Sequence, residues 1–279
     1  MGDIVTMDDL TNQEIVAVLD DAERLVPVAR GDVYLPLLQG KVLANMFFEN
    51  STRTRMSFET AMKRLGGSVL NFTSIGTSVA KGETLYDTMQ MIDGYADVAA
   101  IRHPRQGAAQ YSADAVEIPI LNAGDGAGNH PTQTMLDLFT IRQAHGTLEG
   151  LNVVLVGDLR YGRTVHSLSH ALVRFGAKLT LVSPSTLKMP VEIVSDLREH
   201  GSEIMETESL EDQIAGADVI YVTRIQKERF PDEDEYAKVA GIYKIGVSNL
   251  SGAMKGMIIM HPLPRVDEID PGVDSTEFA

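Results

Sequence analysis

Cysteine is absent from this sequence of 279 residues. Its absence excludes disulfide bonds, thiolate zinc sites and cysteine nucleophiles. Long apolar runs are also missing, since no segment is long enough to span a bilayer as a helix, and we predict no membrane partner. The N-terminal MGDIVTMDDL is acidic and lacks the basic start and apolar run of a secretory signal, so we predict a cytoplasmic protein.

Positive charge is scarce, because 24 Lys and Arg residues stand against 39 Asp and Glu residues, a formal net charge of −15. Nucleic-acid binding needs a concentrated basic surface, so this balance argues against a nucleic-acid partner. A small anionic substrate is compatible with it if positive charge is focused in a cleft while carboxylates cover the outer surface. The length and the hydrophobic content of 44% predict a globular chain of about two domains.

Residues 51–55 (STRTR) place hydroxyls and two guanidinium groups where a predicted strand, 42–48, turns into a predicted helix that ends at Gly66-Gly67. A helix N-terminus offers N–H groups without intrahelical partners and a positive dipole end. This stretch therefore predicts a phosphate-binding site. The alternative is that Ser51 or Thr52 is a plain N-cap, with the two arginines on a solvated helix face.

The rest of the first half alternates strands with helices. The predicted elements are a helix over 9–29, strands over 69–72, 98–101 and 118–121, and a helix over 131–145 that ends at Gly146. Residues 73–83 (TSIGTSVAKGE) are polar and have no apolar period, which predicts a loop able to act as a lid. On residue statistics alone, Lys81 in this loop is a solvated lysine.

The second half has a regular βαβ rhythm from Gly150 onward. The predicted strands are 153–156, 179–182, Ile204, 219–222 and 257–260, and the predicted helices are 163–175, 191–200 and 210–215. This rhythm predicts a parallel sheet with helices on both faces. The turn over 156–164 (VGDLRYGRT) lacks G-x-G-x-x-G, which argues against nicotinamide binding, and we predict no cofactor.

Arg102 and His130 follow predicted strands, and ligands of parallel sheets bind at that edge. Because His130 precedes a helix N-terminus, its imidazolium form is disfavoured and its neutral ring can donate to a developing oxyanion. The alternative is a purely structural histidine. His166 and His170 have the spacing of a zinc pair but lack the adjacent glutamate and third ligand of HExxH sites, so we predict no metal site.

Arg163, Arg224 and Gln226 lie just beyond predicted strand ends, and two arginines with a carboxamide form a receptor for a dicarboxylate. The alternative assigns Arg224 to the densely charged surface run over 224–235. After the last predicted strand, the carbonyl groups of Pro262 and Leu263 are available acceptors, which suits them to hold an –NH2 group.

Together these motifs resemble the catalytic chain of the aspartate carbamoyltransferase family over essentially the whole sequence. The motifs are residues 51–55 (STRTR), 130–133 (HPTQ), 163–164 (RT), 224–226 (RIQ) and 261–265 (HPLPR). The resemblance implies an α/β fold of two domains, each a mostly parallel sheet with helices on both faces, with the active site in the cleft between them. It implies a carbamoyl-phosphate-binding domain over 1–130, a linking helix over 131–146 and an aspartate-binding domain over 147–279.

The implied reaction transfers the carbamoyl group of carbamoyl phosphate to L-aspartate, giving N-carbamoyl-L-aspartate and phosphate in de novo pyrimidine biosynthesis. The implied phosphate ligands are Ser51, Thr52, Arg53, Thr54 and Arg102. The implied partners of the carbamoyl oxygen are Thr54, Arg102 and His130, and those of the carbamoyl nitrogen are Gln133 and the carbonyl groups of Pro262 and Leu263. The implied aspartate ligands are Arg163, Thr164, Arg224 and Gln226. By the same resemblance, the Leu263-Pro264 peptide bond is cis.

Similar enzymes are homotrimers, and the resemblance implies that Lys81 and a nearby hydroxyl, of Thr77 or Ser78, enter the neighbouring subunit's site. It also allows a zinc-bearing regulatory chain as a partner. The family continues into a terminal helix that returns to the first domain, and we expect this helix to be missing from a chain that stops at Ala279. The alternatives are an ornithine carbamoyltransferase, in which a cysteine takes the place of Pro262, and a non-catalytic anion-binding subunit.

Overall fold

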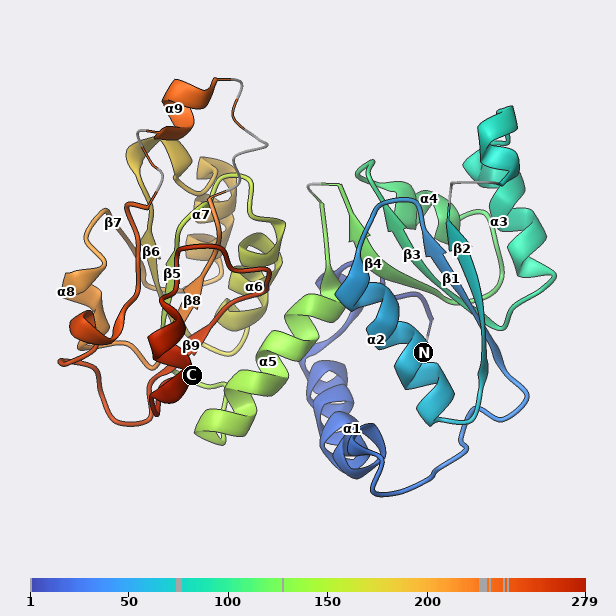
Figure 1. Cartoon of the computed structure of the whole chain (residues 1–279), viewed down its shortest axis with the longest axis horizontal. Helices are drawn as coiled ribbons and strands as arrows, with labels where there is room; N and C mark the ends of the chain where they lie inside the picture. The colour runs from blue at the N-terminus through green and yellow to red at the C-terminus, as the bar shows by residue number, and fades with distance from the viewer. Residues whose placement is uncertain are drawn as a thin grey trace. The chain divides into compact units, whose positions relative to one another are not determined.

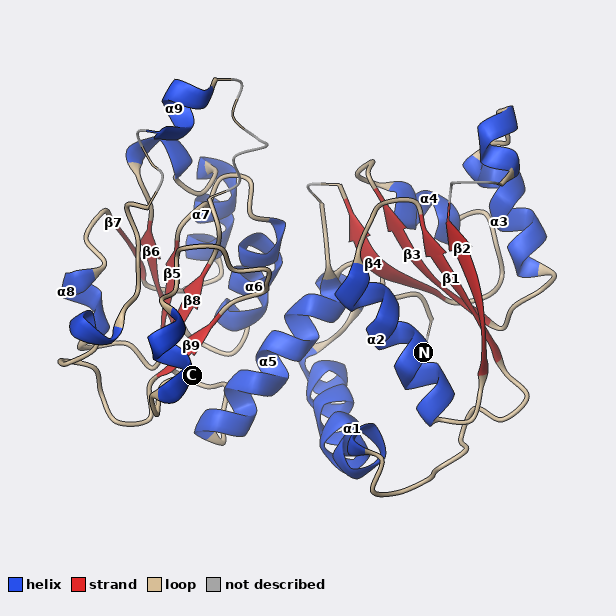
Figure 2. Ribbon diagram, in the orientation of Figure 1, coloured by secondary structure: helices blue, strands red, loops and turns tan. Residues whose placement is uncertain are grey.

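The computed structural model describes residues 2–73, 77–126, 128–225, 230, 232–237, 239 and 241–279. The chain forms two compact units, Met1–Met135 and Leu136–Ala279, and the division falls inside helix α5 (Pro131–His145). Each unit is built on one sheet whose strands are all parallel. Figures 1 and 2 show helices flanking both sheets, which confirms the predicted α/β class.

The first unit has the strand order β2-β1-β3-β4. Its elements are η1 (Met7–Asp9), α1 (Asn12–Arg30), β1 (Val42–Phe47), α2 (Thr52–Arg64), β2 (Ser68–Thr73), η2 (Ser78–Lys81), α3 (Leu85–Asp93), β3 (Val98–His103), α4 (Ala108–Ala113) and β4 (Ile120–Asp125).

Alternate side chains of β1 supply two cores, one on each face of this sheet. Leu43 packs in a cluster with Met62 of α2. Its neighbour Ala44 lies in a separate cluster with Met89 of α3 and Ala109 of α4. Successive side chains of a strand point to opposite faces, so helices cover both faces, as predicted.

Helix α1 begins at Asn12 and not at Asp9, where the apolar period placed it. Thr11 and Glu14 form a capping box, in which each side chain accepts a hydrogen bond from the other residue's N–H group. The Asp9 carboxylate instead accepts the N–H groups of Val5 and Thr6 and closes the separate 3-10 turn η1. Local capping therefore sets the start of the helix.

Strands β3 and β4 are longer than the sequence indicated, so Arg102 lies within β3 and residues 122–125 within β4. The predicted end of the second of these strands at residue 121 was therefore wrong. The reason is tertiary, because β3 and β4 pair with each other as far as His103 and Asp125. Ile4 adds a bridge on β4, where its N–H donates to the carbonyl of Ile120 (2.8 Å) and its carbonyl accepts from Asn122 (2.9 Å). The prediction of a loop over 73–83 was also wrong for residues 78–81, which form the 3-10 helix η2.

The second unit has the strand order β7-β6-β5-β8-β9. Its remaining elements are β5 (Asn152–Val156), α6 (Arg163–Val173), β6 (Lys178–Val182), η3 (Ser185–Leu187), α7 (Val191–Glu199), β7 (Ile204–Thr207), α8 (Glu211–Ile214), β8 (Val219–Val222), α9 (Glu233–Ala237), η5 (Val247–Asn249), β9 (Ile258–Met260) and η6 (Pro271–Ser275).

One face of the second sheet is covered by a cluster that joins Val154 of β5, Ile220 of β8 and Ile214 of α8. Helix α6, with Leu168 and Leu172 fully buried, contacts β6, and Figure 1 shows it on the side of the sheet away from α8. Of the helices in the described ranges, none has the length and apolar character that crossing a membrane requires.

Candidate active site

The N-terminus of α2 carries the predicted phosphate motif. Ser51 occupies the N-cap position with an extended backbone (φ −156°, ψ 109°), but its side chain makes no capping hydrogen bond. The first turn contains no acidic residue, and the Arg53 side chain is exposed. Ser51 is therefore the N-cap residue by position, as the alternative expected, but its hydroxyl does not cap the helix and lies at the positive end of the helix dipole.

Arg102 brings a further guanidinium group toward this motif, because it lies on β3 opposite Phe47 of β1. It is 9% exposed, its Nη1 donates to the carbonyl of Ala123 (3.1 Å), and its Nη2 lies 3.5 Å from Oε1 of Glu49. Burial lowers the pKa of Arg102, the Glu49 carboxylate raises it, and the positive charge of Arg53 lowers it further. Arg53 and Arg102 thus feel each other's field, an arrangement that a bound anion relieves.

Two features of this guanidinium group were missed by the sequence analysis. Glu49, its carboxylate partner, stands only two residues before the STRTR motif. This short distance along the sequence was the signal that could have identified Glu49 as a site residue. The buried Nε of Arg102 has no hydrogen-bond partner within the described ranges. Since a buried donor without an acceptor is costly, this atom favours an acceptor supplied by a ligand.

His130 precedes α5 and is 6% exposed. Its Nδ1 accepts the backbone N–H of Gln133 and lies near the hydroxyl of Thr132, both at 3.3 Å. A ring nitrogen that accepts a hydrogen bond carries no proton, so the proton of the ring is on Nε2. The buried carboxylate of Asp125 also accepts the N–H groups of Gly107 (2.8 Å) and Asn129 (2.9 Å), which holds the loop before His130.

The predicted lid residues lie in and beside η2. Thr77 is half-buried and its carbonyl accepts the N–H of Ala80 (3.2 Å), whereas Lys81 is exposed. Among the residues that the structure describes, no hydrogen bond or ion pair joins Lys81 to residues 51–55. The side chain of Ser78 lies outside the described part of the chain.

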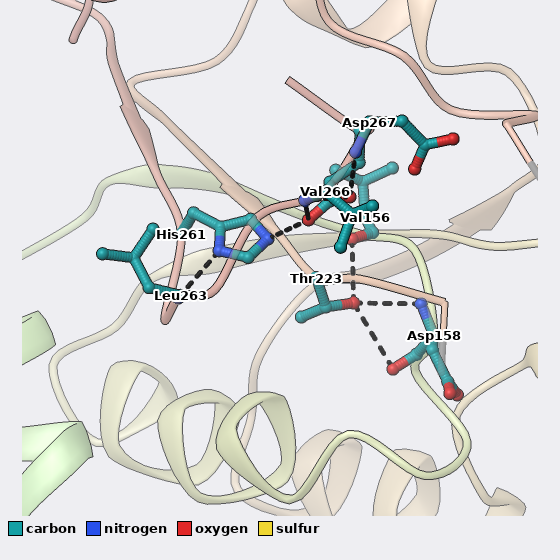
Figure 3. Close-up of polar contacts among 8 residues, drawn as sticks. Val156, Asp158, Thr223, His261, Leu263, Val266 and Asp267 are labelled. Carbon is teal, nitrogen blue, oxygen red and sulfur yellow. Dashed lines mark hydrogen bonds and ion pairs between the residues drawn. The ribbon is translucent and has the colours of Figure 1, made fainter. Parts of the chain in front are cut away.

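In the second unit, Arg163 begins α6 and Arg224 follows Thr223, just beyond β8. Strands β5 and β8 are neighbours, so these two arginines lie after the carboxyl ends of adjacent strands. The hydroxyl of Thr223 accepts the N–H of Asp158 (2.9 Å), and the carboxylate of Asp158 accepts the N–H of Tyr161 (2.9 Å), as Figure 3 shows in part. This pair was not predicted. Gln226 lies outside the described residues.

Thr164 is held by a buried network that the sequence analysis did not predict. Its side chain hydrogen-bonds to the phenol of Tyr221, which donates to the Asp137 carboxylate at 2.8 Å. Burial raises the pKa of the Tyr221 phenol well above its usual value, and Asp137 raises it further. Tyr221 therefore stays protonated and connects α6 to α5 within this unit.

The Leu263-Pro264 bond is cis, which confirms the prediction, and Leu263 has a positive φ of 58°. Its N–H donates to Nδ1 of His261 (2.8 Å). Within the described part of the chain, the carbonyls of Pro262 and Leu263 accept no hydrogen bond. Both acceptors are thus available for an –NH2 group.

Known proteins resemble the chain over nearly its full length. The carbamoyl-P binding domain of the aspartate/ornithine carbamoyltransferases matches residues 2–143, and the Asp/Orn binding domain matches residues 149–278. The chain belongs to the aspartate/ornithine carbamoyltransferase family. This membership confirms the family that the five motifs predicted.

Two family members are named aspartate carbamoyltransferase catalytic subunit. The protein from Archaeoglobus fulgidus is 53% identical to this chain, and the match covers 100% of this chain and 92% of that protein. The protein from Methanothrix thermoacetophila is 54% identical, and the match covers 99% of this chain and 90% of that protein. The solved catalytic subunit of M. jannaschii aspartate transcarbamoylase has a TM-score of 0.93 at 50% identity, covering 100% of this chain and 91% of that one. The Trypanosoma cruzi enzyme in complex with N-(phosphonacetyl)-L-aspartic acid has a TM-score of 0.94 at 40% identity, covering 100% and 89%.

The two histidines with the spacing of a zinc pair, His166 and His170, have other partners. Nε2 of His166 contacts the carbonyl of Leu159 (2.8 Å), and Nε2 of His170 contacts the carboxylate of Asp196 (2.9 Å). Burial lowers the pKa of the His166 ring. No group of three or more ligands that could hold a metal ion occurs among the described residues.

Proposed function

We propose that this family member transfers the carbamoyl group of carbamoyl phosphate to the amino group of L-aspartate. The observation that carries the proposal is the likeness to the T. cruzi enzyme, whose bound ligand joins a phosphonate to aspartate. This chain offers groups suited to both ends of such a molecule. The phosphate motif and Arg102 lie in the first unit, and Arg163 and Arg224 lie in the second.

Each site residue has a role in this reaction. Ser51, Thr52, Arg53, Thr54 and Arg102 bind the phosphate, and Thr54, Arg102 and His130 polarise the carbamoyl oxygen. Gln133 and the carbonyl groups of Pro262 and Leu263 hold the carbamoyl nitrogen. Arg163, Thr164, Arg224 and Gln226 bind aspartate. Guanidinium groups suit phosphate and carboxylate because their planar fork grips two oxygens.

The amine of aspartate attacks the carbamoyl carbon, so a C–N bond forms and the carbonyl oxygen gains negative charge. The Nε2–H of His130 and the guanidinium of Arg102 stabilise this oxyanion. As the intermediate collapses, the bond from carbon to the phosphate oxygen breaks and the departing phosphate takes the proton of the amine. Catalysis then consists mainly of positioning and electrostatic stabilisation.

The assembly is part of the proposal. Residues 1–130 bind carbamoyl phosphate, residues 131–146 link the domains, and residues 147–279 bind aspartate, with the active site between the domains. The enzyme is a cytoplasmic homotrimer in which Lys81 and a hydroxyl of Thr77 or Ser78 complete the neighbouring subunit's site. A zinc-bearing regulatory chain stays a prediction from the resemblance.

The second substrate separates this proposal from ornithine carbamoyl transfer. Ornithine brings an ammonium group toward Arg163 and Arg224, and like charges at close range are costly. A colorimetric assay for carbamoyl amino acids, with each amino acid titrated at saturating carbamoyl phosphate, should show saturable use of L-aspartate and negligible use of L-ornithine. Equal use of ornithine would contradict the proposal, and calorimetric binding of carbamoyl phosphate without product would indicate a non-catalytic subunit.

The arginine after β8 gives a variant for the same assay. Arg224→Gln should raise the KM for aspartate about 100-fold, because it removes a charge-assisted contact, and leave the Kd of carbamoyl phosphate unchanged. Lys255→Gln, at an exposed position of the same unit, is the matched control. Unchanged aspartate saturation in the Arg224→Gln enzyme would remove this residue from the proposed site.

A further inference from the structure

His261 and Glu268 face each other beneath the turn that carries the cis proline. Their side chains are 5% and 8% exposed, and Nε2 of His261 lies 2.7 Å from Oε1 of Glu268. The contact is short but poorly aligned for a hydrogen bond, and Nε2 has no better-aligned acceptor among the described residues. The carboxylate is therefore the group that faces this buried nitrogen.

The other nitrogen of the ring reaches the turn itself. Nδ1 of His261 accepts the N–H of Leu263 at 2.8 Å, so the proton of the ring is on Nε2, toward Glu268. The imidazole thus connects a buried carboxylate to the backbone of Leu263. These two contacts fix both the orientation of the ring and the nitrogen that carries its proton.

Glu268 is itself held rigidly by the backbone. Its carboxylate accepts the N–H groups of Val266 and Asp267, both at 3.1 Å, and its own carbonyl accepts the N–H of Ile245 at 2.9 Å. Burial alone would raise the pKa of Glu268, but the close contact with His261 and the hydrogen bonds from the backbone outweigh it and lower the pKa to about 2. Glu268 is therefore a charged and immobile anchor.

We infer that His261 and Glu268 are positioning residues, which aim the carbonyls of Pro262 and Leu263 at the carbamoyl –NH2 and so make the enzyme select carbamoyl phosphate over other acyl phosphates of similar shape. The inference rests on the proposed function. Leu263 adopts φ 58°, a region that side-chain-bearing residues rarely adopt and that persists only where the surroundings hold it. The hydrogen bond from Leu263 N–H to His261 supplies that hold.

Acetyl phosphate tests the inference, because a methyl group replaces the –NH2 and leaves the phosphate unchanged. We expect His261→Gln, whose amide reaches Glu268 but leaves no acceptor for Leu263, to raise the Kd of carbamoyl phosphate about tenfold and leave that of acetyl phosphate unchanged. His261→Asn, whose carbonyl oxygen takes the place of Nδ1, should keep most of the preference. Asp274→Asn, which removes the partner of Arg265 in the same segment, is the control and should bind both ligands as the wild type does.

The unchanged acetyl phosphate Kd also serves as the folding control, and Glu268→Gln replaces His261→Gln if the latter does not fold. Equal weakening of both ligands, or an unchanged carbamoyl phosphate Kd, would overturn the inference. Formation of carbamoyl aspartate by the wild type is measured separately, so a failure of the proposed function is distinguished from a failure of this pair.

Discussion

A β-carbon added to Gly157 would lie 2.2 Å from the carbonyl oxygen of Thr223, the residue before Arg224. Gly157 also has φ 117°, a region that side-chain-bearing residues rarely adopt. The carboxyl ends of β5 and β8, beyond which Arg163 and Arg224 lie, can approach this closely only because position 157 lacks a side chain.

Gly157→Ala should therefore destabilise the second unit by about 3 kcal/mol, because backbone strain and a clash with a buried carbonyl act together. Thermal unfolding measures the loss. Gly176→Ala is the matched control, since φ is 72° there but no atom lies within 4 Å of the added carbon. It should cost about 1 kcal/mol, and equal losses in the two variants would show that the contact with Thr223 does not matter.

Arg53→Ala should lower kcat/KM for carbamoyl phosphate about 100-fold or more, because it removes charge-assisted hydrogen bonds to the phosphate. The melting temperature should not change, because the Arg53 side chain is exposed. Lys63→Ala is the control on the same helix, where Lys63 pairs with Glu59 at 2.6 Å. Normal turnover by folded Arg53→Ala enzyme would disprove the phosphate assignment.

Mixing Lys81→Ala chains with Arg53→Ala chains should restore activity if neighbouring subunits share each site. Random exchange at equal amounts gives about a quarter of the sites both intact groups in a cyclic trimer. Each variant incubated alone provides the baseline, and native mass spectrometry verifies the exchange. No recovery after verified exchange would place Lys81 outside the neighbour's site.

Tyr221→Phe should raise the KM for L-aspartate about fivefold, because Thr164 loses the phenol that holds it, with no change in the Kd of carbamoyl phosphate. Tyr243→Phe is the control, since that phenol donates to the carbonyl of Glu208 (3.1 Å). It should reduce stability without changing KM. Matching kinetics in the two variants would make the Tyr221 network purely structural.

Glu268 should make the stability of the second unit depend on pH below about 4.5. Its pKa falls from 4.5 to about 2 on folding, so its contribution is complete above pH 4.5 and is lost as the pH falls through 2. From this shift, the contribution is at most about 3 kcal/mol at neutral pH and about half of that at pH 3. Urea unfolding of wild type and Glu268→Gln between pH 6 and 3 should show the difference shrinking, and a constant difference would contradict the assignment.

Local signals in the sequence sufficed for several elements. Helix α5 begins at Pro131, whose missing N–H costs nothing at a first helical position, and ends before Gly146, whose φ is 72°. The Ser51 motif was found for the same reason, since a helix start and its capping residues are neighbours in the chain. The family followed from five such motifs in order.

Tertiary structure decided what local patterns do not contain. The pairing of β3 with β4 as far as Asp125 carried β4 beyond its predicted end at residue 121, and the hydrogen bond from Tyr221 to Asp137 joins residues 84 positions apart. Glu49 and Glu268 can be recognised as partners of Arg102 and His261 only in the structure, where the turns around them bring the side chains together. Motifs predict the groups that meet a substrate because those groups recur at short spacing, whereas the partners that orient them are chosen by packing, which short spacing does not encode.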